Sequence, residues 1–131
     1  MIIVDTTVWV DYLRGTRTPQ TEWVDANLLQ ERLGLTDLIL CEVLQGITRD
    51  DNVPAIQQEL LRFEVFTMGG VKLAIAAAAN YRLLRAKGRT VRRTINTLIA
   101  TYCLLEGHAL LHSDRDYDPF EELLGLAVVH P

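Results

Sequence analysis

The sequence predicts one α/β domain over residues 1–131, a three-layer α/β/α sandwich whose central parallel sheet is covered by helices on both faces. Short apolar segments, typical of buried strands, alternate with longer segments in which apolar residues recur at helical spacing. Such alternation favours parallel strands joined by helices. The length suits one hydrophobic core, and no linker, low-complexity tract or internal repeat divides the chain.

The first half of the chain is expected to hold three short strands and four helices. The opening strand, Ile2-Ile3-Val4, is an apolar run closed by a charge, and Thr6 or Thr7 can cap the helix that follows. The second helix is expected to turn Leu29 toward the core and to break at Gly34. The expected helices cover residues 8–14, 19–32, 39–47 and 54–61. Residues 35–38 are expected to form a short strand or a turn, and residues 63–68 a strand.

The second half contains the clearest helical pattern, over residues 71–87. Val71, Ala74, Ile75 and Ala78 fall at positions i, i+3, i+4 and i+7, the spacing of one face of a helix. Glycines after this helix and the next one mark their ends. The remaining expected elements are a helix over residues 94–106 with Thr94 as its N-cap, a strand over 109–112, a short helix over 119–124 and a last strand over 127–129.

Composition and charge narrow the possible function classes. The net charge of −4 argues against a protein that holds nucleic acid by bulk electrostatics. Residues 65–105 nevertheless contain no acid and several basic residues, so this segment either meets a polyanion or is simply a solvated helix end and loop. No apolar run approaches the roughly 20 residues that span a bilayer. Cys41 and Cys103 are expected to be reduced core residues of a cytoplasmic protein.

Acidic residues follow two of the expected strands. Asp5 closes the first strand, and Asp114 and Asp116 follow the strand over residues 109–112. In parallel α/β sheets, ligands bind beyond the carboxyl ends of the strands, so these carboxylates are expected to converge. Glu42 lies among apolar residues, where a charge is costly unless it is paired or binds metal.

Converging carboxylates repel one another, and a hard divalent cation such as Mg²⁺ or Mn²⁺ relieves that repulsion. Such a metal can lower the pKa of a bound water and stabilise charge on a phosphodiester. Each acid alone also has a structural interpretation, as a helix cap, a residue of a solvated face or part of an acidic turn. Asp118 precedes Pro119 and suits helix capping, so it is left out of the candidate site.

Four segments, taken together, resemble the sequence motifs of PIN-domain nucleases. They occur in the expected order and span nearly the whole chain. The third motif usually has Asp where this chain has Asn96. The segments are Val4-Asp5-Thr6-Thr7-Val8-Trp9-Val10, Cys41-Glu42-Val43-Leu44-Gln45-Gly46, Thr94-Ile95-Asn96-Thr97-Leu98-Ile99-Ala100 and Leu111-His112-Ser113-Asp114-Arg115-Asp116-Tyr117.

The chain is similar in particular to the VapC-type toxins of toxin–antitoxin pairs. That resemblance implies a Mg²⁺- or Mn²⁺-dependent endoribonuclease that cleaves RNA, often tRNA or rRNA. It further implies a VapB-type antitoxin partner, a homodimer and a higher toxin–antitoxin assembly. The candidate catalytic and metal-binding residues are Asp5, Glu42, Asn96, Asp114 and Asp116, the candidate RNA contacts are Arg89, Arg92 and Arg93, and the candidate supporting residues are Thr6 and Ser113.

Asn96 departs from the motif by keeping the shape of Asp without its charge. We therefore expect the activity of this chain to be reduced or lost. Three explanations remain open at this point: a substitution made to disarm a toxic enzyme, natural variation with weakened activity, or adequate ligation by the amide oxygen.

Other interpretations of the same residues are possible. The chain is either a nuclease or a catalytically inactive PIN-like protein that binds a partner through the same fold. A receiver domain is disfavoured because no Lys follows Lys87. A zinc site is disfavoured because His108 and His112, on a strand, would lie about 13 Å apart. The zinc alternative would also use His130. The residues expected to contact an antitoxin are Trp9, Tyr12 and Leu13 of the first helix.

Overall fold

Four short parallel strands form the centre of the protein in a computed structural model that describes residues 1–131. The strands are β1 (Ile2–Val4), β2 (Leu33–Thr36), β3 (Glu64–Phe66) and β4 (Ala109–Leu111). Their order in the sheet is β3-β2-β1-β4, and every pairing is parallel. The order therefore reverses between β1 and β4, which is where open parallel sheets form their ligand sites.

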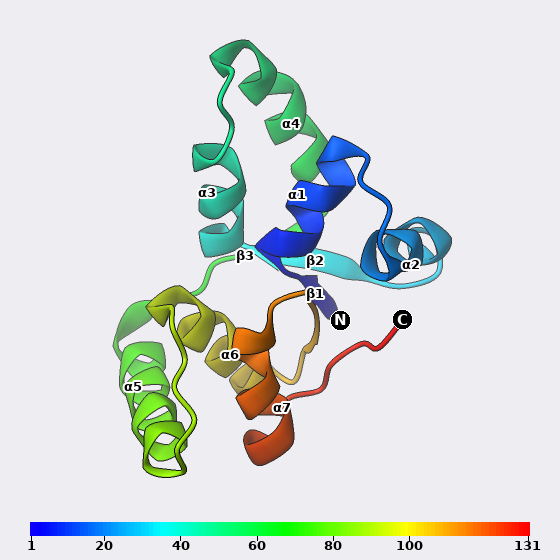
Figure 1. Ribbon diagram of the computed structural model, residues 1–131. Coiled ribbons are helices and arrows are strands. Elements are labelled where there is room, and N and C mark those ends of the chain that lie inside the picture. The colour runs from blue at the N-terminus through cyan, green and yellow to red at the C-terminus, as the bar shows by residue number, and fades with distance from the viewer.

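Seven helices lie on the two sides of this sheet, as predicted for an α/β sandwich. Figure 1 shows α1 to α4 gathered on one side and α5 to α7 on the other. The helices are α1 (Thr6–Arg14), α2 (Pro19–Asn27), α3 (Asp37–Gln45), α4 (Val53–Leu60), α5 (Gly70–Ala86), α6 (Thr94–Glu106) and α7 (Asp118–Leu124), with short 3₁₀ turns at η1 (Asp50–Asn52) and η2 (Arg115–Tyr117).

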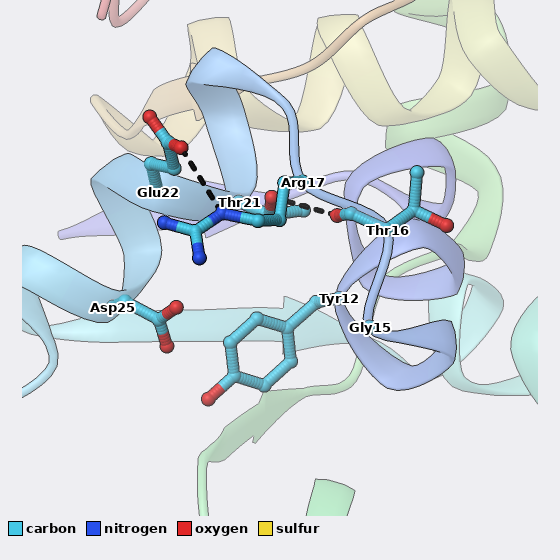
Figure 2. A pocket seen from close by; sticks show the side chains of 7 residues that line it. All are labelled: Tyr12, Gly15, Thr16, Arg17, Thr21, Glu22 and Asp25. Carbon is cyan, nitrogen blue, oxygen red and sulfur yellow. Dashed lines mark hydrogen bonds and ion pairs between the residues drawn. The ribbon is translucent and has the colours of Figure 1, made fainter.

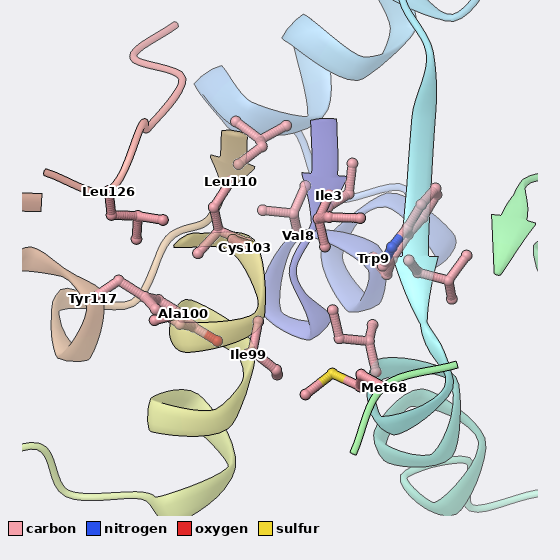
Figure 3. Close-up of a cluster of buried hydrophobic side chains, with 14 of the residues drawn as sticks. Ile3, Val8, Trp9, Met68, Ile99, Ala100, Cys103, Leu110, Tyr117 and Leu126 are labelled. Atoms are coloured by element: carbon pink, nitrogen blue, oxygen red, sulfur yellow. The ribbon is translucent and has the colours of Figure 1, made fainter. Parts of the chain in front are cut away.

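One hydrophobic core runs through both layers, with the side chains of β1 at its centre (Figure 3). Ile3 is fully buried. Trp9 points into the core from α1, and Ile99 and Cys103 enter it from α6. Burial raises the pKa of the Cys103 thiol to about 12. Cys41, by contrast, is exposed, so the prediction that both cysteines lie in the core is wrong for this one.

The segment around Gly34 differs from the prediction. The second helix ends at Asn27 and does not continue to residue 32, and Leu29 in the following turn is fully exposed. Gly34 does not break a helix but lies inside β2, where a Cβ atom would come within 2.8 Å of the Glu64 carbonyl oxygen. Glycine therefore serves close strand packing here, a use that sequence alone does not distinguish from a helix stop.

The helix expected over residues 71–87 is present as α5, but the apolar stripe that marks it in the sequence is not the face that contacts the core. Val71 is 76% exposed and Ile75 is 66% exposed, whereas Leu73, Ala77 and Leu84 are buried. This helix is apolar on more than one face, so helical spacing alone could not decide which stripe meets the sheet. The result is an apolar surface on α5 that this chain leaves uncovered.

Smaller differences concern element ends. Asp5, and not Thr6 or Thr7, is the N-cap of α1, and Arg93, not Thr94, holds the N-cap position of α6. The expected last strand is reduced to a single parallel bridge between Leu110 and Val128. No helix of the structure is long and apolar enough to cross a membrane.

Candidate active site

Three of the candidate acids and Asn96 meet at the sheet edge between β1 and β4. Asp5 follows β1 directly, and its backbone N–H donates to the carbonyl of Leu111 at the end of β4. Asp114 and Asp116 lie in the loop and 3₁₀ turn after β4. Asn96 reaches the same place from the first turn of α6 and is only 3% exposed.

Asn96 connects the members of this cluster through both ends of its amide. Its Nδ2 donates to Oδ2 of Asp114 at 3.3 Å and to Oδ2 of Asp116 at 3.1 Å. Its Oδ1 lies 3.1 Å from the Tyr117 hydroxyl, which also donates to Oδ1 of Asp5 at 2.7 Å. The amide N–H groups thus place positive charge density between two carboxylates that would otherwise repel each other.

Tyr117 belongs to both the core and the site. Its side chain is fully buried, and its hydroxyl joins residues 5 and 96. Burial, and then the nearby Asp5 carboxylate, raise the pKa of Tyr117 well above its usual value, so the phenol stays protonated and can donate.

Asp116 is the most fully satisfied carboxylate of the cluster. Its Oδ1 accepts from the backbone N–H and Nε of Arg92, at 3.3 and 3.2 Å, and its Oδ2 accepts from the backbone N–H of Arg93 and from Asn96. Burial alone would raise its pKa, but the hydrogen bonds from Asn96 and Arg92 outweigh it and lower the pKa. Four donors occupy the roughly four lone-pair positions of a carboxylate. Asp116 therefore acts here as a support for the start of α6, leaving little room for a metal.

Two threonines hold the other carboxylates in place. Thr6 Oγ1 donates to Oε1 of Glu42 at 2.7 Å, and Thr7 donates from its backbone and its hydroxyl to Oδ2 of Asp5, at 3.2 and 2.7 Å. Ser113, the other expected supporting residue, donates from its backbone N–H to the Thr7 hydroxyl. Glu42 on α3 thus lies beside the cluster. It is linked to the cluster through Thr6, which follows Asp5, and through Arg93, which also bonds to Asp116.

The three arginines expected to contact RNA are all paired with acids. Arg89 pairs with Glu122 at 2.6 Å, outside the cluster. Arg92 pairs with Asp116 at 3.2 Å and lies 3.6 Å from Asp114, and Arg93 pairs with Glu42 at 3.2 Å. In this arrangement they do not form a free basic track.

Thr7 and Tyr117 belong to the site although the sequence motifs do not assign them to it. A hydroxyl two residues after a strand-ending Asp can donate back to its carboxylate, which is a signal for Thr7. A tyrosine with buried neighbours normally finds a partner for its hydroxyl, which is a signal for Tyr117.

The donor set suits a hard divalent cation in its chemistry, because it consists of carboxylate oxygens and one amide oxygen. The structure nevertheless contains no group of three or more acid, histidine or cysteine side chains arranged to hold one metal ion. The amide of Asn96 and the guanidinium groups of Arg92 and Arg93 lie against these oxygens instead. These cationic and amide donors reduce the repulsion among the carboxylates, as a bound metal ion would.

Two hollows lie on the α1 side of the molecule. Figure 2 shows a polar one of about 460 Å³ at the end of α1 opposite Asp5, where Arg17 pairs with Glu22 and Thr21 donates to the Thr16 carbonyl. Its polar groups largely satisfy one another. The second is a groove of about 340 Å³ beside α1 and α3, lined in part by Leu13, Val43 and Ile56.

Of the first-helix residues expected to meet a partner, Leu13 lines this groove and Tyr12 lines the polar hollow. Trp9 is fully buried and packs on Phe63, so it is a core residue. A large aromatic side chain close to a strand is often buried in the core.

The chain is similar in sequence and in fold to known proteins. A family model described as "PIN domain" matches residues 2–123. The chain is 29% identical to VapC ribonuclease Mb1587 of Mycobacterium bovis and to ribonuclease VapC11 of Mycobacterium tuberculosis, over 96% of each chain. Its fold is similar to that of chains in the crystal structures of VapBC2 from Rickettsia felis bound to a promoter DNA fragment (TM-score 0.75, 16% identity, 98% of each chain) and of FitAcB from Neisseria gonorrhoeae (TM-score 0.76, 17% identity, 100% of this chain and 98% of that one).

Proposed function

Because the chain belongs to the PIN-domain family, we propose that it is a Mg²⁺- or Mn²⁺-dependent endoribonuclease, the VapC-type toxin of a type II toxin–antitoxin pair. The observation that carries the proposal is the joining of Asp5, Asn96 and Asp114 at the switch point of the parallel sheet. The relatives of similar length that are named as ribonucleases support the choice of RNA as substrate, with tRNA or rRNA as the expected class.

In this proposal Asp5, Glu42 and Asp114 are the ligands, and Asn96 stands at the fourth position. A bound Mg²⁺ or Mn²⁺ supplies an acidic water and neutralises charge on the scissile phosphate. Thr6, Thr7 and Tyr117 orient the ligating carboxylates by donating to them, as groups behind a metal site do.

The test compares cleavage of total RNA by the given chain in Mg²⁺ and in EDTA, with mapping of the cut ends. We expect Asn96→Asp to raise Mg²⁺-dependent cleavage sharply, since it returns the missing negative charge to the cluster. Asp5→Asn should abolish that cleavage, whereas Asp51→Asn, at an exposed carboxylate paired with Arg49, should leave it unchanged.

If Asn96→Asp and Asp5→Asn both cleave RNA like the given chain, the site assignment is wrong. If no variant cleaves RNA but the protein binds an antitoxin, the chain acts as an inactive partner-binding module.

Partner binding forms the second part of the proposal. The groove lined by Leu13, Val43 and Ile56 offers an apolar surface for a VapB-type antitoxin. The exposed Val71 and Ile75 of α5 offer another, which a second copy of the chain would cover in a homodimer.

We further propose that RNA contacts the basic segment before α6, which requires its arginines to exchange their acid partners for phosphates. Removing Arg89, Arg92 or Arg93 should weaken RNA binding with little sequence preference and flatten its salt dependence. Fluorescence anisotropy of a labelled RNA across a salt series measures both effects. An unchanged salt slope would exclude this segment as the RNA-binding surface.

A further inference from the structure

Two consecutive arginines lie over the candidate site. Arg93 Nη2 is 3.2 Å from Oε2 of Glu42, and Arg92 Nη2 and Nε reach Asp114 and Asp116 at 3.6 and 3.2 Å. The two arginine side chains are 64% and 60% exposed, whereas the side chains of the three acids are between 4% and 15% exposed. The guanidinium groups thus close the cluster from the solvent side.

This pairing is selective within the basic part of the chain. Arg89, three residues earlier, turns to Glu122 on α7, and the cations of α5 form no ion pair with any acid. Asp5, the acid that no arginine reaches, receives neutral donors from Thr7 and Tyr117 instead. Glu42, Asp114 and Asp116 are therefore the carboxylates that carry an internal counter-ion.

The arginine side chains are dispensable for the local fold. If the guanidinium of Arg92 is removed, Asp116 still accepts from the backbone N–H groups of residues 92 and 93 and from Asn96. Glu42 keeps the hydroxyl of Thr6 when Arg93 is shortened. Both side chains are long, mostly exposed and permanently charged, so they leave the carboxylates by swinging away and not by losing a proton.

From this geometry we infer that Arg92 and Arg93 regulate the site by competing with the divalent cation for Glu42 and Asp114. The inference rests on the metal-dependent function proposed above. A guanidinium and a dication cannot both sit against the same carboxylate oxygens without strong repulsion, so cation binding displaces the arginines. The same displacement frees two positive side chains beside the cluster, where they can meet a phosphate of the proposed RNA substrate, which couples the two binding events.

The test measures Mn²⁺ binding by isothermal titration calorimetry without RNA, in the full chain and in Arg92→Gln, Arg93→Gln and the double variant. Each single variant should bind Mn²⁺ about 2- to 5-fold more tightly, the range expected for removing one exposed ion pair of up to about 1 kcal/mol. Arg32→Gln, which removes the same charge from an exposed arginine paired with Glu64 outside the cluster, is the matched control and should bind Mn²⁺ like the parent chain. The gain should shrink as ionic strength rises, because exposed charges are screened.

Equal or weaker Mn²⁺ binding by the Arg92→Gln and Arg93→Gln variants would overturn the inference. So would an equal gain in Arg32→Gln, because it would indicate a general effect of net charge. If neither the parent chain nor any variant binds Mn²⁺, both this inference and the proposed metal-dependent function fail. If the variants bind Mn²⁺ more tightly but even Asn96→Asp does not cleave RNA, the nuclease proposal fails while this one stands.

Discussion

At the scale of single residues, Asn96 decides how the acidic cluster holds together. Its amide donates to two carboxylates from a buried position in the first turn of α6. An aspartate there would remove both donors and add a fourth negative charge to Asp5, Asp114 and Asp116, although the helix N-terminus would partly favour it. At position 96, asparagine therefore favours the stability of the metal-free protein, whereas aspartate is expected to favour activity.

We expect Asn96→Asp to lower the free energy of unfolding in EDTA and Mg²⁺ to restore it. Two like charges about 4 Å apart repel by roughly 4 kcal/mol at an effective dielectric of 20, before screening. Urea unfolding in EDTA and in Mg²⁺ measures the difference. Asn52→Asp, at an exposed residue of η1, is the control and should change little. Equal unfolding midpoints for Asn96→Asp and the parent in EDTA would contradict a tight cluster.

The two cysteines should differ sharply in reactivity. Cys41 is exposed, whereas burial, followed by the nearby Asp5 carboxylate, raises the pKa of Cys103 to about 12. Only the thiolate reacts readily, so at pH 8 a thiol reagent should label Cys41 and spare Cys103 until the protein unfolds. Mass spectrometry of the labelled chain, with Cys41→Ser as control, checks this. Rapid double labelling of the folded chain would show that the core around Cys103 is open.

The candidate ligands could be predicted from sequence because each lies in a recognisable motif. Their hydrogen-bond partners could not, because Tyr117 and Asp5 are far apart in the chain and meet only in the folded sheet. The saturation of Asp116 was equally hidden, since two of its donors are backbone N–H groups of another segment.

At the scale of elements, β2 depends on a residue without a side chain. A Cβ at Gly34 would lie 2.8 Å from the Glu64 carbonyl oxygen and 2.9 Å from the Met1 sulfur. Gly34→Ala should destabilise the protein by about 1–3 kcal/mol, the usual cost of overpacking.

Chemical denaturation of this variant measures that cost. Gly46→Ala, where the nearest atoms would be 3.4 Å or more away and φ is −79°, is the matched control and should be tolerated. Equal stabilities of the two variants would mean that β2 and β3 can move apart freely.

The strands could be predicted from the sequence, whereas the inward face of α5 could not. The first strand and the strand over residues 109–112 followed from apolar runs closed by charges, and the structure confirms the parallel α/β fold. Helical spacing did not indicate the inward face of α5, because its exposed stripe is also apolar. An apolar stripe has the same spacing whether it packs on the core or remains exposed.

At the scale of the whole molecule, that exposed stripe bears on assembly. Ile75→Glu should weaken self-association, because it places a charge in an apolar interface. Analytical ultracentrifugation over a concentration series measures the monomer–dimer equilibrium. Leu29→Glu, at a fully exposed leucine outside α5, should leave the equilibrium unchanged. If both variants associate like the parent chain, α5 does not form the interface.

The bond from the Tyr117 hydroxyl to the Asp5 carboxylate joins residues 112 positions apart. During synthesis, the first strand emerges from the ribosome long before its neighbour β4 and the turn that carries Tyr117 exist. A growing chain therefore cannot assemble the candidate centre until nearly all the residues that build the sheet have been translated. A fold that joins Asp5 to Tyr117 thus makes completion of the candidate centre one of the last steps in forming the domain.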